Sequence, residues 1–146
     1  MKKILTTVAA VLVAVALLIL LKNQYGSVFA GSTYGMPALL KQGEVDHLFI
    51  GSSMFRQGLD IDALEENLDG SVYILSYNGN QPVFMAKELE YLLENGLKVE
   101  NLYIDFYAYT LTAVPWISDT KMFLDTDLAF KMDAWKTMAE HNDVGL

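Results

Sequence analysis

The stretch Leu48-Phe49-Ile50-Gly51-Ser52-Ser53 decides the fold of this 146-residue chain. Three consecutive apolar residues are typical of a strand buried on both faces of a parallel sheet, and the glycine and serines end it in a polar turn. Similar strand ends recur at Leu75-Ser76-Tyr77-Asn78-Gly79-Asn80 and at Tyr103-Ile104-Asp105. Because functional residues of doubly wound sheets gather at the carboxyl ends of the strands, we expect a site built from these three turns.

Helix signals separate the three predicted strands. The strands cover residues 45–50, 71–76 and 99–106. A capping box at Asp62-Ala63-Leu64-Glu65 predicts a helix after the first strand. Pro82 suits the first turn of a second helix, and Gly96 suits the residue past its end. A last helix is expected after Ser118 or Asp119, either of which can cap it. This order predicts an α/β fold: a three-layer α/β/α domain with a parallel sheet and right-handed crossovers.

Residues 1–22 are predicted to form a transmembrane anchor. Lys2 and Lys3 precede an uncharged run of 18 residues, Ile4 to Leu21. In a helix this run covers most of a hydrocarbon layer about 30 Å thick, and the leading lysines favour a cytoplasmic N-terminus. The alternative is a signal peptide cleaved near Ala30.

The predicted anchor sets the expected domain organisation and localisation. Residues 23–44 become a linker, and residues 45–146 become a domain on the outer side of the cell membrane, held by a single pass. Three strands and three helices make half of a doubly wound domain, so we expect a domain that is incomplete at its C-terminus.

Charge and composition exclude several functions. All 18 acidic residues, but only seven of the 10 basic ones, follow Lys22, so the domain is not expected to bind nucleic acid. The chain has no cysteine, which excludes thiolate catalysis and a disulfide framework. Two distant histidines and no phosphate-binding glycine loop leave no expected metal site and no expected cofactor.

The first two turns resemble the SGNH/GDSL hydrolase superfamily. Gly51-Ser52-Ser53 is similar to the Gly-Asp-Ser, or relaxed Gly-Ser-Ser, that ends the family's first strand. The stretch from Val72 to Pro82 is similar to its second block, a strand ending in an oxyanion-hole glycine. The resemblance spans about residues 45–110. In style it is most similar to the membrane-anchored branch that includes the lipoteichoic acid D-alanylation protein and relatives in polysaccharide O-acylation.

Carried over to this sequence, the resemblance implies that Ser53 is the nucleophile. The backbone N–H groups of Ser53 and Gly79 would stabilise the oxyanion, and Asn80 is either a further donor or a helix-entry residue. The implied substrates are acyl esters of cell-envelope polymers, such as a cell-surface polysaccharide or teichoic acid. A membrane acyltransferase is an implied partner, and the membrane itself would be reached through the N-terminal helix.

Two family blocks have no counterpart. The third strand ends in Ile104-Asp105-Phe106-Tyr107 without the expected asparagine, and the Asp-x-x-His block that supplies the base is absent. His47 precedes the first strand end, and His141 lacks the aspartate three residues before it. A serine hydroxyl is a poor nucleophile without a base.

Two functions therefore remain open. One is a serine esterase or O-acyltransferase whose full chain supplies an Asp–His pair. The other is a non-catalytic extracytoplasmic binding or assembly module with an SGNH-like fold. In the second case Ser52 and Ser53 are only turn and cap residues, Asp105 is an ordinary strand-end cap, and Arg56 has a surface role.

Overall fold

The computed structural model describes residues 2–29, 35–106, 114–124 and 126–141. The chain divides into two compact units, residues 1–33 and 34–146. Helix α1 (Lys2–Phe29) is the described part of the first unit. No helix in these described ranges is long and apolar enough to cross a membrane. The prediction of an N-terminal transmembrane helix is therefore wrong. A span takes about 20 apolar residues, and the run predicted to form it includes the polar Thr6 and Thr7.

The second unit is built on a parallel sheet of three strands. These are β1 (Glu44–Gly51), β2 (Val72–Ser76) and β3 (Lys98–Ile104), in the order β2-β1-β3. Gly51 lies beside Ser76, and Ile50 lies beside Ile104. All three strands therefore end at one edge, as the α/β part of the prediction requires.

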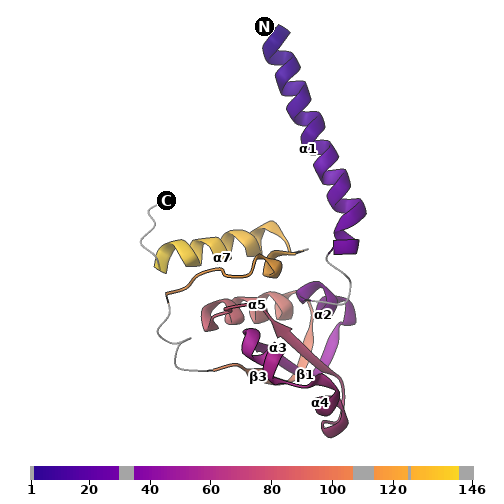
Figure 1. The fold of residues 1–146 in the computed structure, drawn as a ribbon, viewed down its shortest axis with the longest axis vertical. Coiled ribbons are helices and arrows are strands. Elements are labelled where there is room, and N and C mark those ends of the chain that lie inside the picture. Colours follow the sequence, from indigo (N-terminus) through magenta and orange to yellow (C-terminus); the bar gives the residue numbers. More distant parts are fainter. Residues whose placement is uncertain (1, 30–34, 107–113, 125, 142–146) are drawn as a thin grey trace. The chain divides into compact units, whose positions relative to one another are not determined.

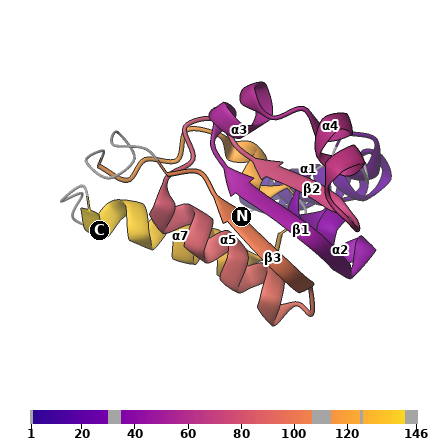
Figure 2. The same cartoon turned by 90° about the horizontal axis from the view of Figure 1, so that it is seen from below.

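Helices cover both faces of this sheet. They are α2 (Met36–Gln42), α3 (Ser53–Gly58), α4 (Ile61–Asn67), α5 (Pro82–Glu94), the short 3₁₀ helix η1 (Thr120–Phe123) and α7 (Leu128–His141). Helix α5 lies between the sheet and α7 (Figure 1). Figure 2 shows α5 and α7 on one side of the sheet and α3 and α4 on the other.

The main core lies between the sheet and the α5 side. Its fully buried members are Met36, Leu39, Leu48, Ile50, Leu75, Tyr77, Phe84 and Leu92. On the other face, the ring of Phe49 stacks on Tyr103 with centroids 4.3 Å apart and meets Phe55 of α3 edge-on at 5.9 Å. Helix α3 is thus fixed to the sheet by aromatic packing just beyond the end of β1.

The predicted linker, residues 23–44, differs from what the structure contains. Helix α1 continues through Phe29, and α2 begins at Met36 with Pro37 in its first turn. Both Met36 and Leu39 are fully buried, and the Tyr73 hydroxyl donates to the Gly35 carbonyl at 3.1 Å. This second half of the predicted linker is therefore part of the domain, because its apolar residues complete the core.

Helix α4 begins two residues earlier than the capping box indicated. Asp60 is its N-cap, and its Oδ1 accepts from the N–H groups of Asp62 and Ala63 at 3.1 and 3.4 Å. The part of the family resemblance at residues 107–110 lies outside the described residues.

Candidate functional site

Three turns meet at the carboxyl edge of the sheet. After β2, the Tyr77 N–H donates to the Gly51 carbonyl at 3.2 Å. After β3, the Asp105 N–H donates to the Ile50 carbonyl at 3.1 Å. Both outer strands thus bond back to the end of β1. The sequence prediction that these turns share one place holds.

Ser52 is a buried structural residue of this edge. Its side chain is 1% exposed, and its Oγ donates to Asp105 Oδ2 at 2.5 Å. The Ser52 N–H donates to the same carboxylate oxygen at 3.1 Å, and Oγ accepts from the Met54 N–H at 3.2 Å as the N-cap of α3. Asp105 therefore binds the start of α3 to the end of β3.

Gly51 is required by the close approach of its neighbours. A Cβ at this position would lie 2.7 Å from the Cβ of Asp105 and 2.8 Å from Cδ2 of Phe55. Real Cβ contacts are not this short, so any side chain here would push Asp105 or α3 away. The glycine that begins the Gly-Ser-Ser motif thus permits the packing that buries Ser52.

Ser53, the predicted nucleophile, is placed differently from Ser52. It is the first residue of α3 and is half-buried. Within the described ranges, neither its hydroxyl nor its N–H makes a hydrogen bond to protein. The first N–H groups of a helix have no partner inside the helix, so this donor is available to a ligand. Ser53 therefore offers a hydroxyl and a backbone donor at one position.

Gly79, the predicted oxyanion residue, lies in the turn between β2 and α5. Its φ of +60° is left-handed, and a Cβ there would lie 2.7 Å from Ser118 Oγ. The Gly79 N–H donates to no acceptor in the described part of the chain. On its N-terminal side, the Asn78 N–H donates to Asp119 Oδ2 at 3.1 Å, and Asn78 Oδ1 accepts from Arg56 of α3. The turn is thus held from two sides.

Asn80, the possible third donor, faces the interior. It is 5% exposed, and its amide nitrogen donates to both carboxyl oxygens of Glu88 at 3.0 Å and to the Gly51 carbonyl at 3.5 Å. Its Oδ1 accepts from the Gln81 N–H at 3.1 Å. These contacts tie the turn to β1 and to α5. A role for Asn80 as oxyanion donor stays a prediction. It would require the Asn80 amide nitrogen to leave Glu88 and the Gly51 carbonyl.

Glu88 is a fully buried carboxyl group behind the turn. Burial raises its pKa to about 8, and the hydrogen bond from Asn80 opposes that rise. The neutral, protonated form therefore predominates at neutral pH. The sequence did not lead us to predict a role for Glu88. Its spacing could have indicated burial, because Glu88 stands three residues after Met85 and four before Leu92, on the apolar face of α5.

Neither histidine contacts the serine turn. His47 Nδ1 lies 3.3 Å from the Tyr103 hydroxyl and Nε2 lies 2.9 Å from the Asp69 carbonyl oxygen. His47 stands four residues before Gly51, about 13 Å along the strand, as the sequence indicated. His141 Nδ1 lies 2.8 Å from the Thr137 carbonyl oxygen of its own helix.

A second structural residue, Gln81, fastens residues 114–119 to the turn. Its Nε2 donates to the Val114 carbonyl at 3.2 Å, and its Oε1 accepts from the Trp116 N–H at 3.1 Å. The Gln81 amide therefore pairs with this segment as a backbone peptide group would, by donating to one carbonyl and accepting from one N–H. No local sequence pattern indicates such a pairing, because its partners lie more than 30 residues further along the chain.

No protein-family model, curated protein or solved structure matches the chain. The edge of the sheet nevertheless has a defined chemical character. It combines the hydroxyl of Ser53 with two backbone N–H groups, of Ser53 and Gly79, that donate to no acceptor in the described residues. Such donors stabilise a negatively charged oxygen.

Proposed function

We propose that this chain is an SGNH-like serine esterase or O-acyltransferase in which Ser53 receives the acyl group. The contrast between its two adjacent serines carries the proposal. Ser52 is buried and engaged with Asp105, whereas Ser53 is half-exposed with no hydrogen bond among the described residues. Ser52 therefore has a structural role at the carboxyl edge of the sheet, and the Ser53 hydroxyl stays accessible at the same edge.

The proposed reaction transfers an acyl group in two steps. Ser53 Oγ attacks the ester carbonyl carbon, the bond to the alcohol breaks, and the Ser53 proton passes through solvent to the departing alcohol, leaving the acyl group on the serine. Water or a sugar hydroxyl then attacks the acyl-serine, and its proton passes to the released Oγ. The N–H groups of Ser53 and Gly79 are the proposed donors to the oxyanion of each step, and loss of one such donor typically costs about 10²–10³ in rate.

Removal of the Ser53 proton is the demanding step. Among the described residues, His47 and His141 bond elsewhere and Asp105 is engaged with Ser52. A serine hydroxyl reacts slowly without a neighbouring base. We therefore expect slow acylation by an activated ester from these residues alone.

A non-catalytic binding or assembly module is the second candidate. The inward placement of Asn80 and the distance of His47 from the turn favour it, because both are groups that an esterase would use near Ser53. In this function the donors of Ser53 and Gly79, with the exposed Arg56, bind an anionic group of a partner without chemical change.

Acylation by p-nitrophenyl acetate distinguishes the two candidates. We expect the intact protein to gain one acetyl group, mapped to Ser53, and we expect Ser53→Ala to gain none. Ser118→Ala is the matched control, because Ser118 is exposed and lies over Gly79 at the same turn. Absence of an adduct in the wild type, or an equal adduct in Ser53→Ala, would reject the enzyme in favour of the binding module.

A further inference from the structure

An apolar cavity of about 250 Å³ lies between α5 and the ends of β1 and β3. It is lined by Ile50, Pro82, Met85, Ala86, Leu89, Ile104 and Phe106. None of these side chains carries a polar group. A ligand in this cavity would gain no hydrogen bond from a side chain, so the cavity suits hydrocarbon and not a sugar or an anion.

The same turns that form the candidate site also bound this cavity. Ile50 stands three residues before Ser53, and Pro82 stands three residues after Gly79. On the third strand, Ile104 and Phe106 flank the aspartate that holds Ser52. The cavity therefore lies at the carboxyl edge of the sheet, where the scissile ester is proposed to bind.

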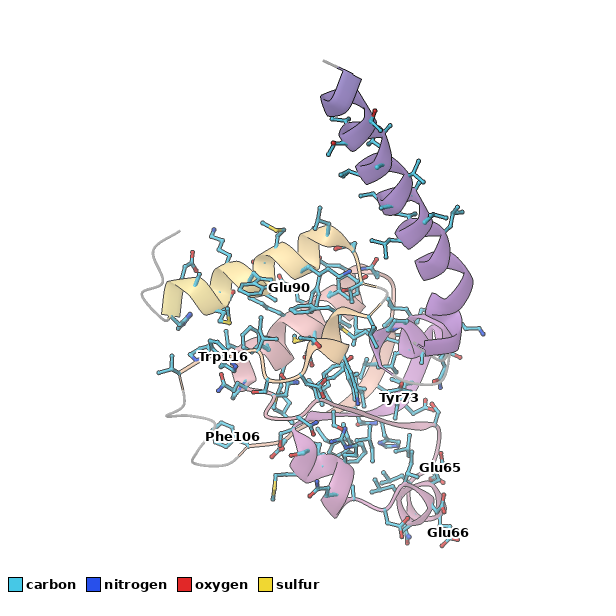
Figure 3. All side chains as sticks on the ribbon, turned by 45° about the horizontal axis from the view of Figure 1, so that its top comes forward. Glu65, Glu66, Tyr73, Glu90, Phe106 and Trp116 are labelled. Carbon is cyan, nitrogen blue, oxygen red and sulfur yellow. The ribbon has the colours of Figure 1, made fainter. Side chains whose placement is uncertain are left out.

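The cavity has a buried floor and an exposed rim. Ile50 and Met85 are 1% and 2% exposed, whereas Ile104 and Phe106 are 50% and 68% exposed. Figure 3 shows Phe106 projecting from the ribbon beyond the end of β3. An apolar chain can thus enter past β3 and reach the core without displacing it.

We propose that this cavity binds the hydrocarbon chain of the acyl group that Ser53 receives. The proposal rests on the function proposed above and adds a substrate class, esters of short to medium aliphatic acids. At about 30 Å³ for each water-sized group, the cavity holds about eight heavy atoms, and a dry engineered cavity of about 150 Å³ already binds benzene. Each buried CH₂ should tighten binding about fourfold.

Binding of linear alcohols tests the cavity without any chemistry. We expect affinity for the whole protein, measured by calorimetry from butanol to decanol, to rise about fourfold per CH₂ and to level off near eight carbons. Ala86→Leu fills the cavity from the exposed side of α5 and should weaken binding at least tenfold. Ala63→Leu, the same change at an exposed position of α4, is the matched control and should leave binding unchanged.

A chain-length series of p-nitrophenyl esters separates this proposal from the proposed function. Chain-length selectivity in kcat/KM that Ala86→Leu abolishes and Ala63→Leu leaves unchanged supports both. Alcohol binding without any turnover supports the cavity and rejects the enzyme. Turnover at Ser53 with no chain preference and no alcohol binding overturns the cavity proposal alone. Equal effects of Ala86→Leu and Ala63→Leu also overturn it.

Discussion

At the residue scale, the adjacent serines differ in their surroundings. Ser52 is buried and hydrogen-bonded to Asp105, whereas Ser53 is half-buried. Ser52→Ala removes the Oγ donor to Asp105 and the N-cap of α3 together. We expect a loss of about 1–3 kcal/mol in the free energy of unfolding, measured with urea. Ser53→Ala, the control one residue along, should change it by less than about 0.5 kcal/mol. Equal losses would contradict the structural assignment of Ser52.

Glu88 makes stability depend on pH in an uncommon direction. Its pKa is 4.5 as a reference and about 8 when folded, so between these values the folded state holds a proton that the unfolded state has released. The free energy of unfolding therefore falls as pH rises through this window, by up to about 1.4 kcal/mol per pH unit. Below about pH 4.5 both states are protonated, and the penalty from Glu88 is absent.

Glu88→Gln should remove this dependence, because glutamine keeps a neutral carbonyl acceptor for Asn80. Urea unfolding at about pH 5 and about pH 8 measures it, and the variant should gain stability over the wild type mainly at the higher pH. Glu90→Gln is the control, since Glu90 is exposed on the same helix (Figure 3). An unchanged pH slope in Glu88→Gln would show that Glu88 is ionised inside the fold.

Residue identities at the edge were only partly predictable. Gly51 and Gly79 follow from the strand–turn pattern, because a tight turn beside packed strands needs a residue without a Cβ. The spacing of Glu88 on the apolar face of α5 indicates its burial. The Ser52–Asp105 pair joins residues 53 positions apart, and local patterns carry no information about such a partner.

At the element scale, the Gln81 side chain holds residues 114–116 on the domain. Gln81→Ala removes both bonds of that contact, to Val114 and to Trp116. We expect the amide of Trp116 to exchange with deuterium about tenfold faster, as two lost hydrogen bonds allow. Gln57→Ala, on the exposed face of α3, is the control and should leave this rate unchanged. A rate unaffected by Gln81→Ala would mean that packing, not this side chain, fixes the segment.

Strands were more predictable than short helices. Strands β1 and β2 contain consecutive apolar residues that are mostly buried, whereas β3 is mostly exposed and is marked by Val99 and the apolar run 102–104. All three were placed correctly to within a few residues. Helix α2 has seven residues, too few to be stable alone. It exists because Met36 and Leu39 pack into the core, which sequence periodicity over so short a stretch does not reveal.

At the scale of the whole molecule, the chain divides into two compact units, residues 1–33 and 34–146. Residues 34–146 contain the sheet, its hydrophobic core and the bond from Tyr73 to Gly35. We expect a chain beginning at Tyr34 to unfold cooperatively, with a free energy of unfolding within about 0.5 kcal/mol of the full chain. Urea unfolding of both chains measures this. Loss of a cooperative transition in the shorter chain would show that residues 1–33 complete the fold.

The turn between β2 and α5, which contains the Gly79 N–H, also contains an asparagine that can deamidate. Asn78 is exposed and is followed by Gly79, whose N–H has no acceptor in the described residues. With no side chain to hinder it, that nitrogen can attack the side-chain carbonyl carbon of Asn78, release ammonia and close a cyclic imide; asparagine is among the residues that heat degrades. Water then opens the ring to aspartate or isoaspartate, which adds a charge beside Arg56 and, in the second case, a methylene to the backbone. Stored protein should therefore degrade at the place where catalysis is proposed.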